Sequence, residues 1–106
     1  MKMWVVEMET LRAERELEKL VKSGALSKTD QFIISAWTRQ VMFHGPDSLQ
    51  ADSKWSDHAL EDEWLGYRSS SFSVRGRIIY RIEGKTVKVK VARITTTHNY
   101  TREGKK

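Results

Sequence analysis

Two histidines and two arginines in this 106-residue chain are the residues best suited to chemistry: His58, His98, Arg68 and Arg77. RNA can be cut without a metal when its own 2′-OH attacks the adjacent phosphate. That reaction needs a base, an acid and a cation for the phosphorane charge. Two imidazoles that titrate near neutrality and two guanidinium groups could supply these functions. For any single histidine, the alternative is a surface or capping role.

Basic residues are concentrated in the second half of the chain. Residues 64–106 have eleven Lys/Arg and two acids, a formal charge of +9, whereas residues 1–63 have a charge of −4. Such clustering favours a polyanionic partner, because it creates a focused potential. The side chains expected to hold an RNA backbone are Lys54, Arg75, Arg81, Lys88, Lys90 and Arg93. The alternative is a solvated sheet face whose lysines protect an edge from aggregation.

Other kinds of chemistry have little support in the sequence. The three histidines share no metal-ligand spacing and the chain has no cysteine, so we expect no metal and no cofactor. The serines at 69–71 have no evident basic partner, which argues against a serine nucleophile. Asp57 and the acids at 61–63 would favour the charged form of His58. Their alternative is a solvated loop.

Two helices are expected to follow a short strand at residues 4–6. Thr10 caps the first helix, which ends at Ser23-Gly24. Its apolar stripe comprises Leu11, Leu17, Leu20 and Val21. The second helix starts at Ser27 or Thr29, has apolar residues at spacings of three and four, and ends before Gly45-Pro46. Two such helices joined by a short loop form an antiparallel hairpin.

Three strands should carry the basic residues, at about 67–74, 77–83 and 86–94, with an irregular polar loop at 47–63 before them. Val87, Val89 and Val91 alternate with Lys88 and Lys90, so the valines should face the helices. We therefore predict one α+β domain over residues 1–106. In it, the helices pack on one face of a small antiparallel sheet, and the opposite face is open.

The remaining expectations concern the cellular compartment. No apolar run approaches the ~20 residues that a membrane span needs, and the apolar residues before Glu7 are too few for a signal peptide. The absence of cysteine fits a reducing cytosol. We expect a cytoplasmic protein without a membrane partner.

Four short segments resemble the RelE/ParE superfamily of bacterial type II toxins, and most closely its YafQ-like and RelE/StbE-like branches. They are DHAL at 57–60, WLGYR at 64–68, RIIYR at 77–81 and RITTTH at 93–98. Ser71 and Arg75 stand where the YafQ-like pattern has a histidine and an aspartate. The resemblance implies the same fold, with helices packed on an antiparallel sheet.

The resemblance also implies an activity and partners. Many members of the family cut mRNA in the ribosomal A site without a metal, and a cognate antitoxin silences each member. By position, His58 and His98 would be the acid–base pair, with Tyr100 beside His98. We assign His58 as the base and His98 as the acid, and the opposite assignment stays open because an imidazole near neutrality can do either. Arg68 and Arg77 would stabilise the phosphorane. Two alternatives stay open: a ParE-like toxin that poisons DNA gyrase, and an RNA-binding module without chemistry.

Overall fold

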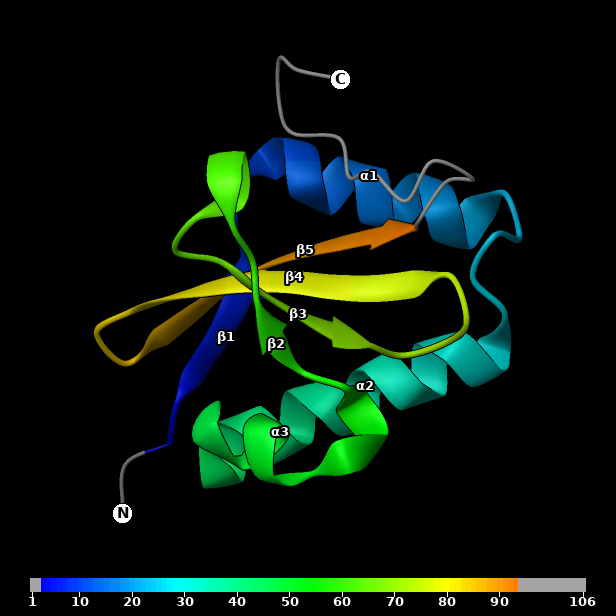
Figure 1. Ribbon diagram of the computed structural model, residues 1–106. Coiled ribbons are helices and arrows are strands. Elements are labelled where there is room, and N and C mark those ends of the chain that lie inside the picture. Colours follow the sequence, from blue (N-terminus) through cyan, green and yellow to red (C-terminus); the bar gives the residue numbers. More distant parts are fainter. Residues whose placement is uncertain (1–2, 94–106) are drawn as a thin grey trace.

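The fold is built around one mixed sheet, seen in a computed structural model that describes residues 3–93 (Figure 1). The strands are β1 (Val5–Met8), β2 (His58–Ala59), β3 (Arg68–Ser71), β4 (Gly76–Glu83) and β5 (Thr86–Arg93). Their order across the sheet is β1-β5-β4-β3-β2. β1 pairs in parallel with β5, and every other neighbouring pair is antiparallel. The predicted α+β class is confirmed.

The helices begin and end at residues that the sequence marks. Thr10 accepts a hydrogen bond from the backbone of Ala13 and caps α1 (Leu11–Lys22). Ser27 and Asp30 form a capping box at the start of α2 (Lys28–His44). α2 ends at Gly45, whose φ of +83° favours glycine, and a Cβ there would lie 3.0 Å from the Trp4 indole.

Both long helices contribute to one core. Leu17 and Leu20 of α1 pack against the same buried cluster as Trp37 and Val41 of α2. Figure 1 shows α1 running alongside β5 and α2 next to α3 (Asp47–Ala51). Leu11 is 69% exposed and Val21 is 38% exposed, whereas Ala13 is buried. Of the predicted apolar stripe of α1, only Leu17 and Leu20 therefore pack against the core.

The segment predicted as an irregular loop is more ordered than expected. Residues 47–63 contain α3, β2 and the short 3₁₀ helix η1 (Ser53–Trp55). They also contain the start of a second 3₁₀ helix, η2 (Asp62–Trp64). β2 adds to the edge of β3 through only two residue pairs. The loop prediction was wrong here because so short a strand has no recognisable period.

The strand register divides the sheet residues between two faces, since side chains alternate along a strand and paired residues share a face. The core face, which meets the helices, includes Val6, Arg68, Ser70, Ile78, Tyr80, Val87, Val89 and Val91. The outer face includes Glu7, His58, Ser69, Ser71, Arg77, Ile79, Arg81, Lys88 and Lys90. The valines therefore face the core as predicted.

The outer face is less open than predicted. Ser69 and Ile79 lie at its centre, and both are fully buried. Lys90 is only 6% exposed. β4 is the middle strand of the sheet and is buried on both faces around Ile78, Ile79 and Tyr80, which explains the uninterrupted apolar run in its sequence.

Candidate active site

His58 is held on the outer face by β2. It pairs with Ser69, which pairs in turn with Ile79, so the imidazole lies on the same side of the sheet as the basic residues of β4 and β5. The residue is exposed. Its Nδ1 atom lies 3.0 Å from the carbonyl oxygen of Ser56, and no partner is found for Nε2 among residues 3–93. This geometry leaves one ring nitrogen available for chemistry.

Arg77 lies on the same face, near the start of β4. Its Nη1 atom donates to three carbonyl oxygens of the β3–β4 turn: Ser73 at 3.0 Å, Val74 at 3.2 Å and Gly76 at 2.9 Å. These bonds fix the guanidinium at the end of the hairpin while its other nitrogens make no hydrogen bond within the described chain. Arg77 is therefore an oriented cation with donors to spare for an anion.

The register gives the separation of these two residues. His58 is two strands from β4, and Arg77 is two residues along β4 from Ile79, the residue in line with His58. Strand spacing and residue rise put their Cα atoms roughly 12 Å apart. Ser69, which lies between them, is fully buried, and the Arg77 guanidinium is held at the β3–β4 turn. The structure places His58 and Arg77 on one face of the sheet, and their shared catalytic role stays a prediction.

Arg68 does not join them, because it lies on the core face. Its Nε donates to Asp57 Oδ1 at 2.7 Å, and the Asp57 side chain is fully buried. A rigid sheet separates Arg68 from the outer face, so it cannot contact the same phosphate as Arg77 directly. The sequence could not predict the face of Arg68, because the face depends on the pairing register and a shift of one residue moves a side chain to the opposite face.

Asp57 is the residue that sequence reasoning undervalued. Besides Arg68, it accepts hydrogen bonds at Oδ2 from Ser70 Oγ and from the Tyr80 hydroxyl, each at 2.6 Å. Ser70 Oγ in turn accepts from Trp37 Nε1 at 3.0 Å. The acid before His58 is thus the centre of a buried network that joins β2, β3, β4 and α2. Its only sequence signal was its place beside His58.

The network changes the acidity of its members. Burial raises the pKa of Tyr80 above its ordinary 10.0, and the hydrogen bond to Asp57 raises it further. Burial alone would lower the pKa of Arg68, but the hydrogen bond and charge of Asp57 outweigh it, so this pKa is raised. Tyr80 therefore stays protonated and Arg68 stays charged over the physiological range.

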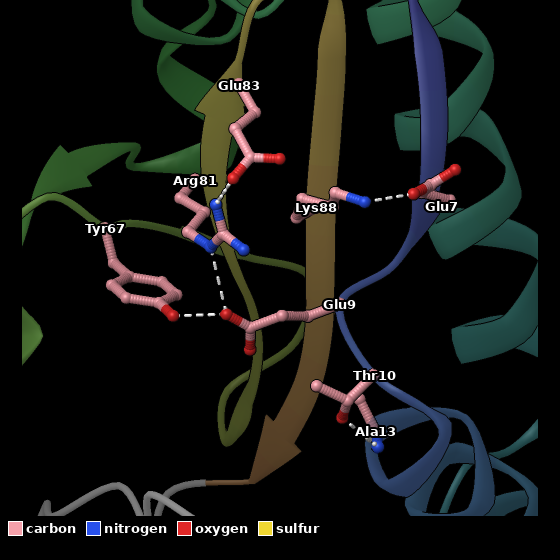
Figure 2. Close-up of polar contacts among 8 residues, drawn as sticks. All are labelled: Glu7, Glu9, Thr10, Ala13, Tyr67, Arg81, Glu83 and Lys88. Atoms are coloured by element: carbon pink, nitrogen blue, oxygen red, sulfur yellow. Dashed lines mark hydrogen bonds and ion pairs between the residues drawn. The ribbon is translucent and has the colours of Figure 1, made fainter.

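Most of the predicted RNA-binding cations on β4 and β5 are paired with carboxylates, and Figure 2 shows the pairs of Arg81 and Lys88. Arg81 contacts Glu9 through Nε at 3.1 Å and Glu83 through Nη1 at 2.6 Å. The hydrogen bond to Glu83 and, to a smaller extent, that to Glu9 raise the pKa of Arg81. Lys88 pairs with Glu7. The predicted cations are on the expected face, but their charges are largely neutralised.

Lys90 and Tyr67 extend this pairing. Nearly buried, Lys90 contacts Glu16 of α1 at 2.6 Å. The Tyr67 hydroxyl donates to Glu9. Burial, followed by the interaction with Glu9, raises the pKa of Tyr67. Figure 2 shows Tyr67 and Arg81 converging on the same Glu9 carboxylate.

The other predicted site residues lie at the edges or outside the described chain. Lys54 is exposed, stands 5.2 Å from the Trp55 ring centre and is 3.8 Å from Asp52. Arg75 is exposed in the β3–β4 turn. The side chain of Arg93, together with His98 and Tyr100, lies outside the described residues, so their roles stay predictions.

A cavity of about 460 Å³ lies between α2 and the end of β3. Its lining includes Phe32, Ile33, Trp55 and Lys54 but neither His58 nor Arg77. No group of three or more His, Cys, Asp or Glu side chains able to hold a metal ion is found within residues 3–93. In the same part of the chain, no helix is long and apolar enough to cross a membrane.

Comparison with solved structures places this architecture among bacterial toxins. The YafQ structure from E. coli strain BL21(DE3) superposes with a TM-score of 0.60 at 16% identity, covering 88% of this chain and 93% of that one. The chain has the YafQ fold. A copper-bound mutant toxin from Helicobacter pylori gives a TM-score of 0.62 at 14% identity, covering 88% and 94%. The expected RelE-like fold is confirmed.

A third neighbour is a complex. In the E. coli DinJ–YafQ toxin–antitoxin structure, the YafQ-like fold covers 84% of this chain and 88% of that one, with a TM-score of 0.56 at 17% identity. No family model and no curated protein matches the sequence. At these identities the likeness to YafQ is a likeness of fold.

Proposed function

We propose that this chain is the toxin of a type II toxin–antitoxin system and cuts mRNA on the ribosome. The observation that carries the proposal is an exposed histidine and an oriented arginine on the same sheet face of a YafQ-like fold. In the proposed reaction, the 2′-OH attacks the adjacent phosphate, the 5′-oxygen leaves, and a 2′,3′-cyclic phosphate remains. No metal takes part.

His58 would remove the 2′-OH proton, and Arg77 would stabilise the phosphorane charge. His98, with Tyr100, is the proposed acid that protonates the leaving 5′-oxygen. Arg68 contributes indirectly, by holding Asp57 next to His58. Fold alone does not determine chemistry, so the residues carry this assignment.

The RNA backbone would meet two kinds of cation. Arg75 and Lys54 are exposed and are proposed to contact phosphates directly, with Arg93 as a further contact. Arg81 and Lys88 are half-buried and paired, and Lys90 is nearly buried, so each must exchange a carboxylate for a phosphate before it binds RNA. This exchange makes binding by the paired residues weaker, because the lost carboxylate pair offsets part of the gain from each phosphate contact.

The proposed partners are mRNA in the ribosomal A site and a cognate antitoxin, and the proposed site of action is the cytoplasm. DinJ is the antitoxin bound to YafQ in a neighbouring structure. An acidic antitoxin segment would be complementary to a chain with a net charge of +5.

The test is to induce the chain in a bacterial host and map the 5′ ends of cellular RNA. We expect growth arrest with cuts in codon register. His58→Gln should abolish both, because a general base contributes about 10²–10⁴ in rate. The matched control is His44→Gln, which changes an exposed histidine in the last turn of α2, away from the outer face. It should remain toxic.

Two other outcomes would reject the proposal. A DNA-damage response with intact mRNA would indicate a gyrase-directed toxin. Tight, salt-sensitive RNA binding with intact RNA would indicate a binding module without chemistry.

A further inference from the structure

The backbone next to His58 contacts one of the two ring nitrogens, Nδ1. The proposed reaction needs a basic nitrogen but does not specify which of the two it is. We infer that the protein selects the reactive nitrogen of His58: the Ser56 carbonyl keeps the proton on Nδ1, Nε2 remains the proton acceptor, and Asp57 is the positioning residue that maintains this arrangement. The inference rests on the proposed function only in naming Nε2 as the atom that removes the 2′-OH proton.

The tautomer follows from the chemistry of the contact. Nδ1 of His58 lies 3.0 Å from the Ser56 carbonyl oxygen. A carbonyl oxygen can only accept a hydrogen bond, so Nδ1 must carry the proton. A neutral imidazole has one donor and one acceptor, which leaves the lone pair on Nε2. The nitrogen farther from the backbone is therefore the one able to act as a base.

Ser56 directs its carbonyl independently of the histidine. It follows η1 and adopts left-handed dihedrals, φ 46° and ψ 43°. Its backbone N–H donates to the Ser53 carbonyl at 3.1 Å, which closes the turn. A non-glycine residue pays a small conformational cost in this region, so the turn is maintained by its surroundings.

Asp57 supplies those surroundings, because it lies between the carbonyl and the ring. Its buried carboxylate is tied to Arg68 and Ser70 of β3 and to Tyr80 of β4. The Ser70 hydroxyl links the same carboxylate to Trp37 in the core. With Asp57 fixed at three points, the peptide groups on both sides of it are fixed, and so is the direction of the His58 side chain.

The experiment measures the tautomer directly. Long-range ¹⁵N–¹H correlation spectra of the full chain, labelled with ¹⁵N-histidine and recorded at alkaline pH where an imidazole is neutral, identify the protonated ring nitrogen. The His58→Gln and His44→Gln variants assign the signals. We expect Nδ1–H for His58 in the wild type. A dominant Nε2–H form, or equal populations of the two, would overturn the inference.

Variants then test the role of Asp57. Asp57→Asn should lower the population of the Nδ1–H form of His58 and slow RNA cleavage roughly 10- to 100-fold through kcat, because a base displaced by about 1 Å loses that much rate. Tyr80→Phe removes one of the three donors and should give a smaller loss. Tyr80→Phe also tests the role of Asp57 if the Asp57→Asn variant folds poorly. The control, Asp47→Asn, changes an exposed carboxylate of α3 and should leave tautomer and rate unchanged.

The results separate this inference from the proposed function. An Nδ1–H tautomer that Asp57→Asn disturbs, in a chain that never cuts RNA, supports the inference and rejects the proposed activity. Cleavage that depends on His58, combined with a tautomer and kcat that Asp57→Asn and Tyr80→Phe leave unchanged, supports the activity and rejects Asp57 as a positioning residue.

Discussion

Two adjacent serines of β3 should respond to the same substitution with opposite signs. Ser69 and Ser70 are both fully buried, but they lie on different faces of the sheet. The Ser69 hydroxyl has no hydrogen-bond partner within residues 3–93. The Ser70 hydroxyl donates to Asp57 at 2.6 Å and accepts from Trp37 at 3.0 Å. The two alanine substitutions are chemically identical, so they isolate the effect of the hydrogen bonds.

The expected magnitudes follow from these contacts. Ser70→Ala removes a hydrogen bond to a buried carboxylate and leaves the Trp37 N–H unpaired, which together should cost about 3 kcal/mol of unfolding free energy. Ser69→Ala removes an unsatisfied buried hydroxyl. After allowance for the lower strand propensity of alanine, it should stabilise the chain by about 1 kcal/mol. The two variants should therefore differ by about 4 kcal/mol.

The assay is urea unfolding followed by far-UV circular dichroism, with thermal melts in parallel. Equal m-values would show that both variants unfold from the same compact state. A difference of this size corresponds to roughly 20 °C between their midpoints. Free energies within about 1 kcal/mol of each other would refute the reasoning. Reversed signs would mean that β3 is paired one residue out of register, since such a slip exchanges the two serines between faces.

Two further predictions concern the arginines and the alkaline limit of stability. Arg68→Ala should cost about 3 kcal/mol of unfolding free energy because it leaves Asp57 buried without its counter-ion. Arg77→Ala should leave stability nearly unchanged and lower RNA cleavage about 10²–10³-fold, and the reverse pattern in urea unfolding and cleavage assays would contradict the face assignment. Stability should also fall as pH rises above about 10, because the unfolded chain then loses the Tyr80 proton while the folded chain keeps it, with a slope of up to about 1.4 kcal/mol per pH unit. Tyr80→Phe should reduce this slope between pH 9 and pH 11 in urea titrations, and an unchanged slope would contradict the raised pKa of Tyr80.

The parts of the fold that could be predicted from sequence are those with local causes. Thr10, Ser27 and Gly45 are helix-terminal signals that act within one turn of backbone, and all three stand where the structure begins or ends a helix. The alternation in β5 assigned Val87, Val89 and Val91 to the core for the same reason. Each of these inferences needs only neighbouring residues.

The parts that could not be predicted depend on residues far apart in the chain. Arg68 and Arg77 look equivalent in sequence, and only the β3–β4 register places them on opposite faces. Asp57 became buried because Tyr80, 23 residues later, carries a hydroxyl to the same point. The apolar run of β4 did contain a usable signal, because consecutive buried residues indicate a central strand with both faces covered.

The separation of charge along the sequence is a weak guide to the charge of a surface. Within residues 3–93, acids of the first half pair with bases of the second in four places: Glu7 with Lys88, Glu9 with Arg81, Glu16 with Lys90, and Asp57 with Arg68. Because the sheet places β1 and α1 beside β5, much of the charge that the sequence separates is neutralised in the fold.

One cationic area within residues 3–93 lies at the β3–β4 turn. Neither Arg75 nor Arg77 has a carboxylate partner among the described residues, and both stand at the end of the sheet where Arg93 pairs with Gly76. A polyanion could therefore contact this end of the sheet, where the residue proposed to stabilise the phosphorane stands. The net charge of the chain suggests a partner, but the register of the strands determines where that partner can bind.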